Sequence, residues 1–360
     1  MNSVKIFLGN VYLTIPSVFS KTGIVGGIML YSLVAVLNTY TMTQILYVAD
    51  AYSRKEDKNG KLTEVKSYTD LSERVHGKVG KVIVIILMFI VQFSCCVGYL
   101  YFVPNVVDAI ICDQTGKKYC DNSTLFKYLM LIPTIPLSLL KTYTYLSYVS
   151  MSGIACALVG GLLLIGYCGN ELATGKAPAG EIKIFEYAEF FGYVGIAMFS
   201  FEGNGIVINL KAAARNKSSY PNILRLAIVV IIIWYMILAS ISYVTYKDET
   251  GKKDYITQNL PITAFTIAIQ ILFCINALSS YPIQILCAFE IIEDLEFFSR
   301  KQDSKLVHNF KVITERVLVI LVVTLVAILI PSFVDFLNIS GSIGAASLGF
   351  ILPPIYYFKV

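Results

Sequence analysis

The chain has 360 residues, of which 56% are hydrophobic and 15% charged, and its formal net charge is +5. A soluble domain of this size carries roughly 25% charged residues, so the composition excludes an ordinary soluble protein. The apolar residues fall into long uncharged runs, which indicate membrane-spanning segments.

Ten of these runs are candidates for helices that cross a membrane, a crossing that needs about 20 mostly apolar residues. The short run before Leu140 is bounded by Lys127 and Lys141, whose long side chains can reach the two surfaces. The run that ends at Phe201 reaches span length by continuing to Leu210. The sequence thus predicts an all-α protein with one transmembrane domain over residues 1–360. Its expected spans are Ile6–Ser20, Thr22–Ala49, Val82–Val107, Tyr128–Leu140, Thr142–Asn170, Phe190–Leu210, Leu226–Tyr246, Tyr255–Phe289, Val317–Val334 and Phe336–Phe358.

Lysine and arginine are distributed unequally between alternate loops. If the N-terminus is cytoplasmic, the inner side holds twenty of these residues and the outer side nine. Cytoplasmic loops carry the excess of positive charge, so both termini are expected inside. The net positive charge then reflects topology, and no nucleic-acid partner is expected. Pro16 interrupts the first run and no small-residue cleavage site follows it, so we expect no cleaved signal peptide.

The eight cysteines form no C-x-x-C pair and no metal-ligand spacing, so no metal site is expected. Cys112 and Cys120 share a predicted outer loop, on the oxidising side, and this predicts a disulfide between them. Asn122 begins an Asn-Ser-Thr sequon in the same loop and is a candidate glycosylation site.

Two of the expected spans contain helix-weakening residues. In "FSFEGNGIVINL", Phe199 to Leu210, Glu202 is the only acidic residue well inside a span, and Gly203, Asn204 and Gly205 follow it. A charge at the bilayer centre costs on the order of 3 kcal/mol, and freed backbone is tolerated there only inside protein or beside a cavity. The first span, "GNVYLTIP", has Gly9 and Asn10 followed by Pro16.

Interruptions in the first and sixth spans indicate a five-plus-five inverted repeat in which helices 1 and 6 are discontinuous. The two repeats would cover residues 1–170 and 187–358, although they share no long sequence similarity. The start of a half-helix suits a carboxylate, and unwound carbonyls suit an ammonium group or a cation. An amino acid carries both groups. The alternative is that Glu202 caps a freed N–H group and that Gly203 serves packing.

Five segments resemble the amino acid/auxin permease family, whose members have the leucine-transporter-like fold. They follow in the family's order: "GNVYLTIPSVF"; "SYTDLSERVHGKVGK" with "QFSCCVGYLYF"; "FSFEGNGIVIN"; "SSYPIQILCAFEIIED"; and the run from Glu315 to Tyr357. There are departures from the family pattern. Val11 replaces a glycine of the first motif, Asn209 replaces a proline of the sixth-span motif, and the family's usual eleventh span and N-terminal tail are missing from this sequence.

The resemblance implies a set of substrate-contacting residues on the two interrupted spans. They are Gly9, Asn10, Val11, Tyr12, Leu13, Phe201, Glu202, Gly203, Asn204 and Gly205. Ser279 and Ser280, before Pro282, resemble the family's coupling-ion positions, with helix back-bonding as the alternative. Tyr99 on the third span is a candidate to close the pocket, and Glu202 is also a candidate to carry a coupling ion.

These observations predict a secondary transporter of neutral amino acids, coupled to H⁺ or Na⁺, in the plasma membrane or a vacuolar or lysosomal membrane. Beyond the co-transported ion we expect no cofactor, and beyond substrate and lipid no obligate protein partner. The alternatives are an amino acid sensor without net flux and a truncated family member that does not transport. A channel needs more polar spans. An enzyme is not expected, because no second mid-span acid, histidine or metal cluster accompanies Glu202.

Overall fold

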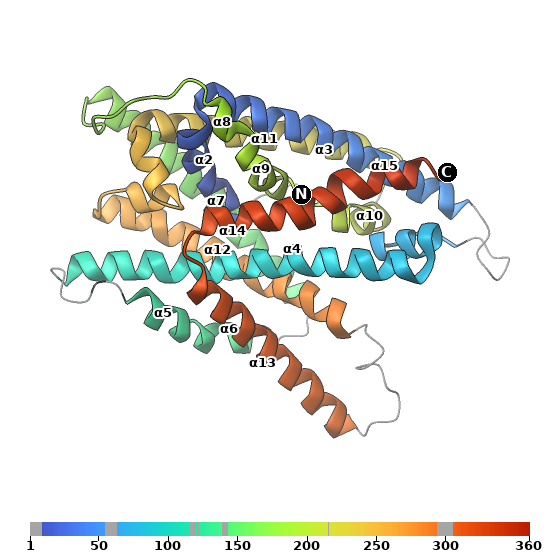
Figure 1. Cartoon of the computed structure of the whole chain (residues 1–360). Helices are drawn as coiled ribbons and strands as arrows, with labels where there is room; N and C mark the ends of the chain where they lie inside the picture. Colours follow the sequence, from blue (N-terminus) through green and yellow to red (C-terminus); the bar gives the residue numbers. More distant parts are fainter. Residues whose placement is uncertain are drawn as a thin grey trace.

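The structure, a computed structural model, describes residues 9–54, 63–115, 120, 122–138, 143–214, 216–293 and 305–360. Every regular element in these ranges is a helix, as the composition predicts (Figure 1). The elements are η1 (Asn10–Thr14), α2 (Ile15–Thr22), α3 (Ile24–Ser53), α4 (Tyr68–Gln114), α5 (Ser123–Leu129), α6 (Leu131–Ser138), α7 (Tyr143–Ala173), α8 (Tyr187–Phe190), η2 (Phe191–Tyr193), α9 (Val194–Ser200), α10 (Asn204–Ala213), α11 (Tyr220–Tyr246), η3 (Lys247–Lys252), η4 (Ile256–Asn259), α12 (Ala264–Glu293), α13 (Lys305–Leu329), α14 (Phe333–Ser340), η5 (Gly341–Ala345), η6 (Ser347–Ile351) and α15 (Leu352–Tyr357).

Within the described ranges, eight helical stretches are long and apolar enough to cross a membrane. Two shorter pairs, η1 with α2 and α5 with α6, occupy the positions of the first and fourth expected spans. Residues 139–142, at the end of the fourth, lie outside the described residues. The eight stretches are Ile24–Ser53, Tyr68–Gln114, Met151–Ala173, Tyr187–Ala213, Tyr220–Lys252, Ala264–Phe289, Phe310–Leu329 and Phe333–Tyr357.

The start of the eighth span was predicted wrongly. The uncharged run begins at Tyr255, but α12 begins at Ala264. Pro261 cannot donate a helical hydrogen bond, and the Thr263 hydroxyl accepts the N–H of Thr266 at 3.3 Å. A hydroxyl in this position starts a helix, so the residues before it form a separate outer segment that includes η4.

The long helix α4 crosses the middle of the bundle, and it bends at Gly77 (Figure 1). Gly77 has φ 69° and ψ −158°, a conformation that favours glycine. The turn before the bend begins at Ser67, whose hydroxyl accepts the N–H of Asp70 at 3.1 Å. The bend lets the first part of α4 lie against the last helix, where Tyr356 donates to the Ser72 hydroxyl at 2.7 Å.

Helix α9 packs almost backbone to backbone against the junction of α14 and η5. A Cβ atom at Gly195 or Gly341 would collide with backbone oxygen of the facing helix. Asn338 of α14 fixes the same contact, because its Oδ1 accepts the N–H of Ile196 at 3.0 Å. Small residues therefore set the position of α9, the helix that leads into the sixth-span interruption.

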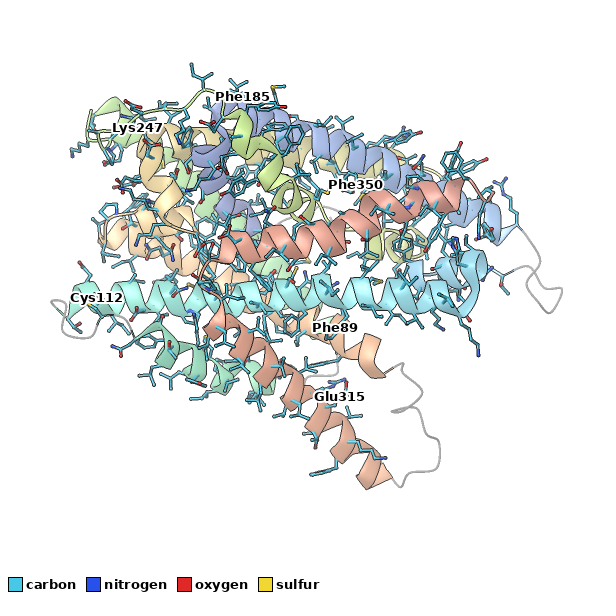
Figure 2. The ribbon with its side chains drawn as sticks, viewed as in Figure 1. Phe89, Cys112, Phe185, Lys247, Glu315 and Phe350 are labelled. Atoms are coloured by element: carbon cyan, nitrogen blue, oxygen red, sulfur yellow. A yellow bond between two sulfur atoms is a disulfide. The ribbon has the colours of Figure 1, made fainter. Side chains whose placement is uncertain are left out.

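Contacts at the ends of helices join segments that the charge distribution assigns to one side. At the predicted inner side Lys211 forms an ion pair with Asp50 at 2.6 Å. At the predicted outer side Lys247 donates to the carbonyl of Pro178 at 3.1 Å. Cys112 and Lys247 lie at the same end of the bundle in Figure 2, and the C-terminus lies at the other end in Figure 1.

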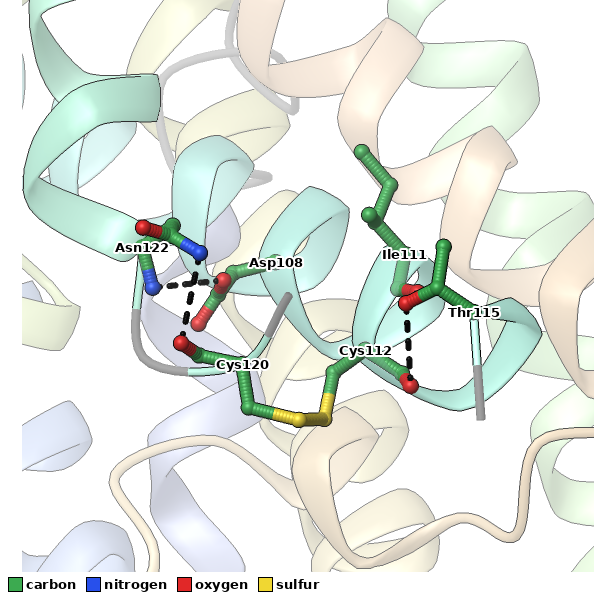
Figure 3. The surroundings of a disulfide bond; sticks show 6 residues. All are labelled: Asp108, Ile111, Cys112, Thr115, Cys120 and Asn122. Carbon is green, nitrogen blue, oxygen red and sulfur yellow. Dashed lines mark hydrogen bonds between the residues drawn. A yellow bond between two sulfur atoms is a disulfide. The ribbon is translucent and has the colours of Figure 1, made fainter. Parts of the chain in front are cut away.

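A disulfide joins Cys112, at the end of α4, to Cys120 (Figure 3). The neighbouring Asn122 is held by two hydrogen bonds. Its backbone N–H donates to Asp108 at 3.0 Å and its side chain donates to the carbonyl of Cys120 at 3.2 Å. The bridge and these bonds fix the connection between α4 and α5.

The charge distribution and the fold predict that the disulfide lies on the side opposite Lys311. The test is labelling with a membrane-impermeant cysteine reagent at Lys311→Cys and at a cysteine placed beside Asp113. The reagent should label one of these positions only from one face of the membrane, and the other only from the opposite face. Access to both positions from one face would contradict the ten-span topology.

Candidate functional site

The sixth expected span is interrupted between α9 and α10. The first helix ends at Ser200, residues 201–203 leave the helix, and the second begins at Asn204. A tight turn ends α9. The N–H of Phe201 donates to the Met198 carbonyl at 3.3 Å, and the N–H of Glu202 donates to the Phe199 carbonyl at 3.1 Å. The interruption lies at the residues where the sequence predicts it.

Glu202 caps the second half of the interrupted span. Its Oε1 accepts the N–H of Gly205 at 3.3 Å, and the amides of Gly203 and Asn204 lie within its reach. The first amides of a helix have no partner within the helix, and a carboxylate there is favoured by the helix dipole. This contact offsets part of the cost of placing a carboxylate in the membrane interior.

Asn38 of α3 supports the interruption from the opposite side. Its Nδ2 donates to the freed carbonyl of Phe201 at 2.6 Å, and its Oδ1 accepts from the Asn204 side chain at 2.8 Å. Both asparagines are buried. Gly349 leaves space for this pair, because a Cβ there would lie 2.7 Å from Asn204 Nδ2. Three distant segments therefore meet at one unwound turn.

Residues 6–8 of the first expected span lie outside the described residues, and the described part forms a 3₁₀ helix, η1, which continues into α2. Pro16 lies in the first turn of α2, where its missing N–H is tolerated. Asn10 fastens η1 to α12, because it accepts from Asn276 Nδ2 at 2.6 Å and donates to the Phe273 carbonyl at 3.4 Å. Among the described residues, no side chain caps the start of η1.

The two interrupted segments border one cavity of about 70 Å³. A water molecule needs roughly 10–15 Å³ by this measure, so the space corresponds to about five waters. The cavity is lined by Gly9, Asn10, Val11, Val91, Gln92, Ser94, Cys95, Gly98, Tyr99, Phe199, Ser200, Glu202, Ile206, Tyr255, Gln284, Phe333 and Leu337.

The structure divides the expected substrate-contacting residues into three groups. Gly9, Asn10, Val11, Tyr99 and Glu202 line the cavity. Gly203, Asn204 and Gly205 do not, but they shape the interruption and cap contact described above.

Tyr12, Leu13 and Phe201 form the third group, which is fully buried behind the cavity. The rings of Tyr12 and Phe201 both pack on Tyr235 of α11, with centroids 5.6 and 5.7 Å away. These aromatic contacts hold the two interrupted segments together.

The two serines of α12 do not line this cavity. Ser279 is buried against α7, where a Cβ at Gly153 would lie 2.8 Å from the Ser279 Cβ. Ser280 lies within hydrogen-bonding reach of the Tyr99 hydroxyl, as does Gln284 one turn later. Ser280 and Gln284 thus position a cavity residue from the facing helix.

Sequence reasoning missed several residues that line the cavity. Gln92 and Gln284 are polar residues within apolar runs, and that signal was present in the sequence. Tyr255 and Phe333 were assigned to spans as ordinary apolar residues, and only the folded chain brings their rings together, with centroids 5.2 Å apart.

An aromatic layer closes the cavity toward the predicted outer side. Tyr255 donates to the Gly98 carbonyl at 3.3 Å, and Tyr101 stacks on Phe333 with centroids 5.3 Å apart. Asp254 fastens this layer. It accepts from the Tyr101 hydroxyl at 2.7 Å and from the N–H groups of Phe333 and Val334 at 3.0 and 3.2 Å.

We predict that Asn38→Leu destabilises the protein and weakens ligand binding. The leucine has a similar volume but leaves the Phe201 carbonyl and the Asn204 amide unpaired, each at a cost of about 1–3 kcal/mol. The measurements are the thermal unfolding midpoint in detergent and the binding of labelled amino acids. Thr39→Val, which removes a hydroxyl on the next residue of α3, should change neither. An unchanged midpoint and affinity in Asn38→Leu would contradict this account of the interruption.

Comparison with known proteins identifies relatives over the whole length of the chain. A family model described as transmembrane amino acid transporter protein matches residues 1–360. Amino acid transporter AVT3C of Arabidopsis thaliana is 28% identical over 363 residues, which cover 97% of this chain and 79% of that protein. Amino acid transporter ANT1 of the same plant is 24% identical over 372 residues, covering 100% and 83%. Vacuolar amino acid transporter 3 of Schizosaccharomyces pombe is 23% identical over 360 residues, covering 99% of this chain and 52% of that protein.

The family match confirms the resemblance seen in the five sequence segments. It also agrees with the helical architecture, because the family model describes a transmembrane protein. The family is one of transporters, so the expectation that the chain is not an enzyme is confirmed as well. The chain is a multi-span membrane protein that belongs to the transmembrane amino acid transporter family.

Proposed function

We propose that the chain is a secondary active transporter of neutral amino acids, coupled to H⁺ or Na⁺. The observation that carries the proposal is the cavity at which the two interrupted segments meet. Non-helical backbone at membrane depth is tolerated where it borders such a cavity, and in secondary transporters this is where substrate binds. We further propose ten transmembrane helices in a five-plus-five inverted repeat, with η1–α2 and α9–α10 as the discontinuous pair.

The lining of the cavity disfavours a substrate with an acidic side chain and offers apolar contacts to a neutral one. Glu202 is the only charged residue among the described lining residues, and it already accepts from the start of α10. A negatively charged side chain would find no cation there, and burying an unpaired charge is costly. Val11, Val91, Phe199 and Leu337 offer apolar contacts instead.

The two charged ends of an amino acid each have candidate partners. The start of η1, at Gly9 to Val11, suits the carboxylate, because helix starts favour negative charge and no described side chain caps this one. The Glu202 carboxylate and the side chains of Tyr99 and Gln284 offer acceptors to the ammonium group. A volume that corresponds to about five waters favours a small substrate.

We assign the transporter to a vacuolar or lysosomal membrane, with the plasma membrane as the alternative. The support is the similarity to vacuolar amino acid transporter 3 of Schizosaccharomyces pombe.

The direct test is uptake of a panel of labelled amino acids into proteoliposomes, with and without a Na⁺ gradient and a pH gradient. Accumulation of small neutral amino acids under one of the two gradients is expected. Binding without accumulation under either gradient would contradict transport and favour a sensor. Equal uptake of charged amino acids would contradict the proposed selectivity.

Glu202 is the first candidate to carry a coupled proton, because it is a carboxyl group that contacts the cavity. Glu202→Gln keeps an oxygen that accepts from Gly205 but cannot take up a proton. If the coupled ion is H⁺, this variant should retain substrate exchange and lose at least tenfold of the accumulation driven by a pH gradient.

Glu189→Gln, in the exposed helix α8, is the matched control and should behave like the wild type. Unchanged pH-driven accumulation in Glu202→Gln would assign the carboxylate to capping alone. Sodium coupling through Ser279 and Ser280 would then be the candidate, and their alanine variants should lose sodium-driven accumulation.

A further inference from the structure

A second cavity, of about 240 Å³, lies between α4 and α10 at the end of the bundle that holds the C-terminus. Its lining includes Tyr68, Lys81, Asn209 and Cys287. It lies on the predicted inner side, and we call it the inner cavity. The function proposed above gives it no role.

The cavity at which the two interrupted segments meet is called the substrate cavity below. Two residues, Gln92 and Ile206, line both this cavity and the inner cavity. The two spaces are therefore neighbours separated by these side chains. At the other end, the outer cavity around Asp254 shares no described lining residue with the substrate cavity, because the aromatic layer lies between them. In this conformation a ligand in the substrate cavity is therefore closer to the inner cavity than to the outer cavity.

Gln92 is unusual for its position in the middle of α4. Its side chain is 8% exposed, and within the described part of the chain no hydrogen bond holds its amide. The amide borders both cavities, so its hydrogen-bonding groups are available to water or a ligand there. An amide carries both a donor and an acceptor, and so can bond either the carboxylate or the ammonium group of an amino acid.

We propose that Gln92 is a positioning residue for substrate release, and that the inner cavity is a second subsite for the amino acid on its way to the inner surface. This rests on the proposed function. As the substrate leaves Glu202, its polar groups form hydrogen bonds with the Gln92 amide. The substrate therefore keeps a polar partner while it passes between the side chains of Gln92 and Ile206, which separate the two cavities. In the inner cavity the Lys81 ammonium and the Asn209 amide then face the substrate carboxylate. Lys81 also forms an ion pair with Glu73, which does not line the cavity, at 3.0 Å.

The first experiment separates passage from binding. Gln92→Leu keeps the side-chain size and removes both hydrogen-bonding functions. It should reduce kcat for uptake at least tenfold while the Kd of the labelled amino acid changes less than threefold. Gln92→Asn should restore part of the rate. Gln284→Leu is the matched control, because Gln284 lines only the substrate cavity, and it should instead raise the Kd. Wild-type kcat in Gln92→Leu, or a Kd raised as much as in Gln284→Leu, would overturn the proposal.

The second experiment needs no transport activity, so it distinguishes failure of this proposal from failure of the proposed function. Cys95 lines the substrate cavity and Cys287 lines the inner cavity. A membrane-impermeant cationic methanethiosulfonate added from the inner face should modify both, as read residue by residue by mass spectrometry of the wild-type protein.

Ile206→Trp, which enlarges the divider, should slow modification of Cys95 at least tenfold and leave Cys287 unchanged. Equal Cys95 rates in the variant and the wild type would refute the route, and so would Cys95 that reacts only from the outer face or not at all.

Discussion

The fold depends on satisfying the peptide groups that leave the helix at residues 201–203. A spanning helix normally pairs all its backbone groups internally, and in the hydrocarbon interior an unpaired group costs several kcal/mol. Here the Phe201 carbonyl is paired by Asn38 and the first amides of α10 by Glu202. These contacts need close packing of the surrounding helices. Gly195 and Gly341 let α9 approach the α14–η5 junction, and Gly349 leaves space for Asn38 and Asn204. The chain can leave the helix beside the cavity because the Phe201 carbonyl and the Gly205 amide both have partners there.

The two sides of the cavity are built differently. Toward the outer side, stacked rings fastened by Asp254 separate the substrate cavity from solvent. Toward the inner side, the side chains of Gln92 and Ile206 divide it from the inner cavity, which extends to the start of α4. The Lys211–Asp50 ion pair meanwhile ties α10 to α3 at the inner end. Alternating access requires two states that expose the site to opposite faces. Breaking the contacts of Asp254 would open one side, and moving α10 would widen the other.

Much of this could be predicted from the sequence. The apolar runs predicted the long spanning helices, because the lipid interior favours apolar residues. The sides assigned from the loop charges remain a prediction. Glu202 and its glycines indicated the interruption, since they conflict with a continuous buried helix. The sequence could not show that Tyr12 and Phe201 do not line the cavity. A motif indicates which residues lie near the helix interruption, but it does not show in which direction an aromatic side chain points. The partnership of Asn38 with residue 201, separated by more than 160 positions, has no local signal at all. The same holds for Asp254, whose neighbours are brought together only by the fold.

In the proposed function an amino acid binds between the start of η1 and Glu202, in the cavity where the two interrupted segments meet. The most direct measurement is an experimental structure determined with a transported amino acid bound. We expect density for the amino acid in contact with Gly9–Val11 and with Glu202 or Tyr99. Its side chain should lie against Val91, Phe199 and Leu337. Density for the amino acid elsewhere, with the cavity unchanged and α9 and α10 continuous, would contradict it.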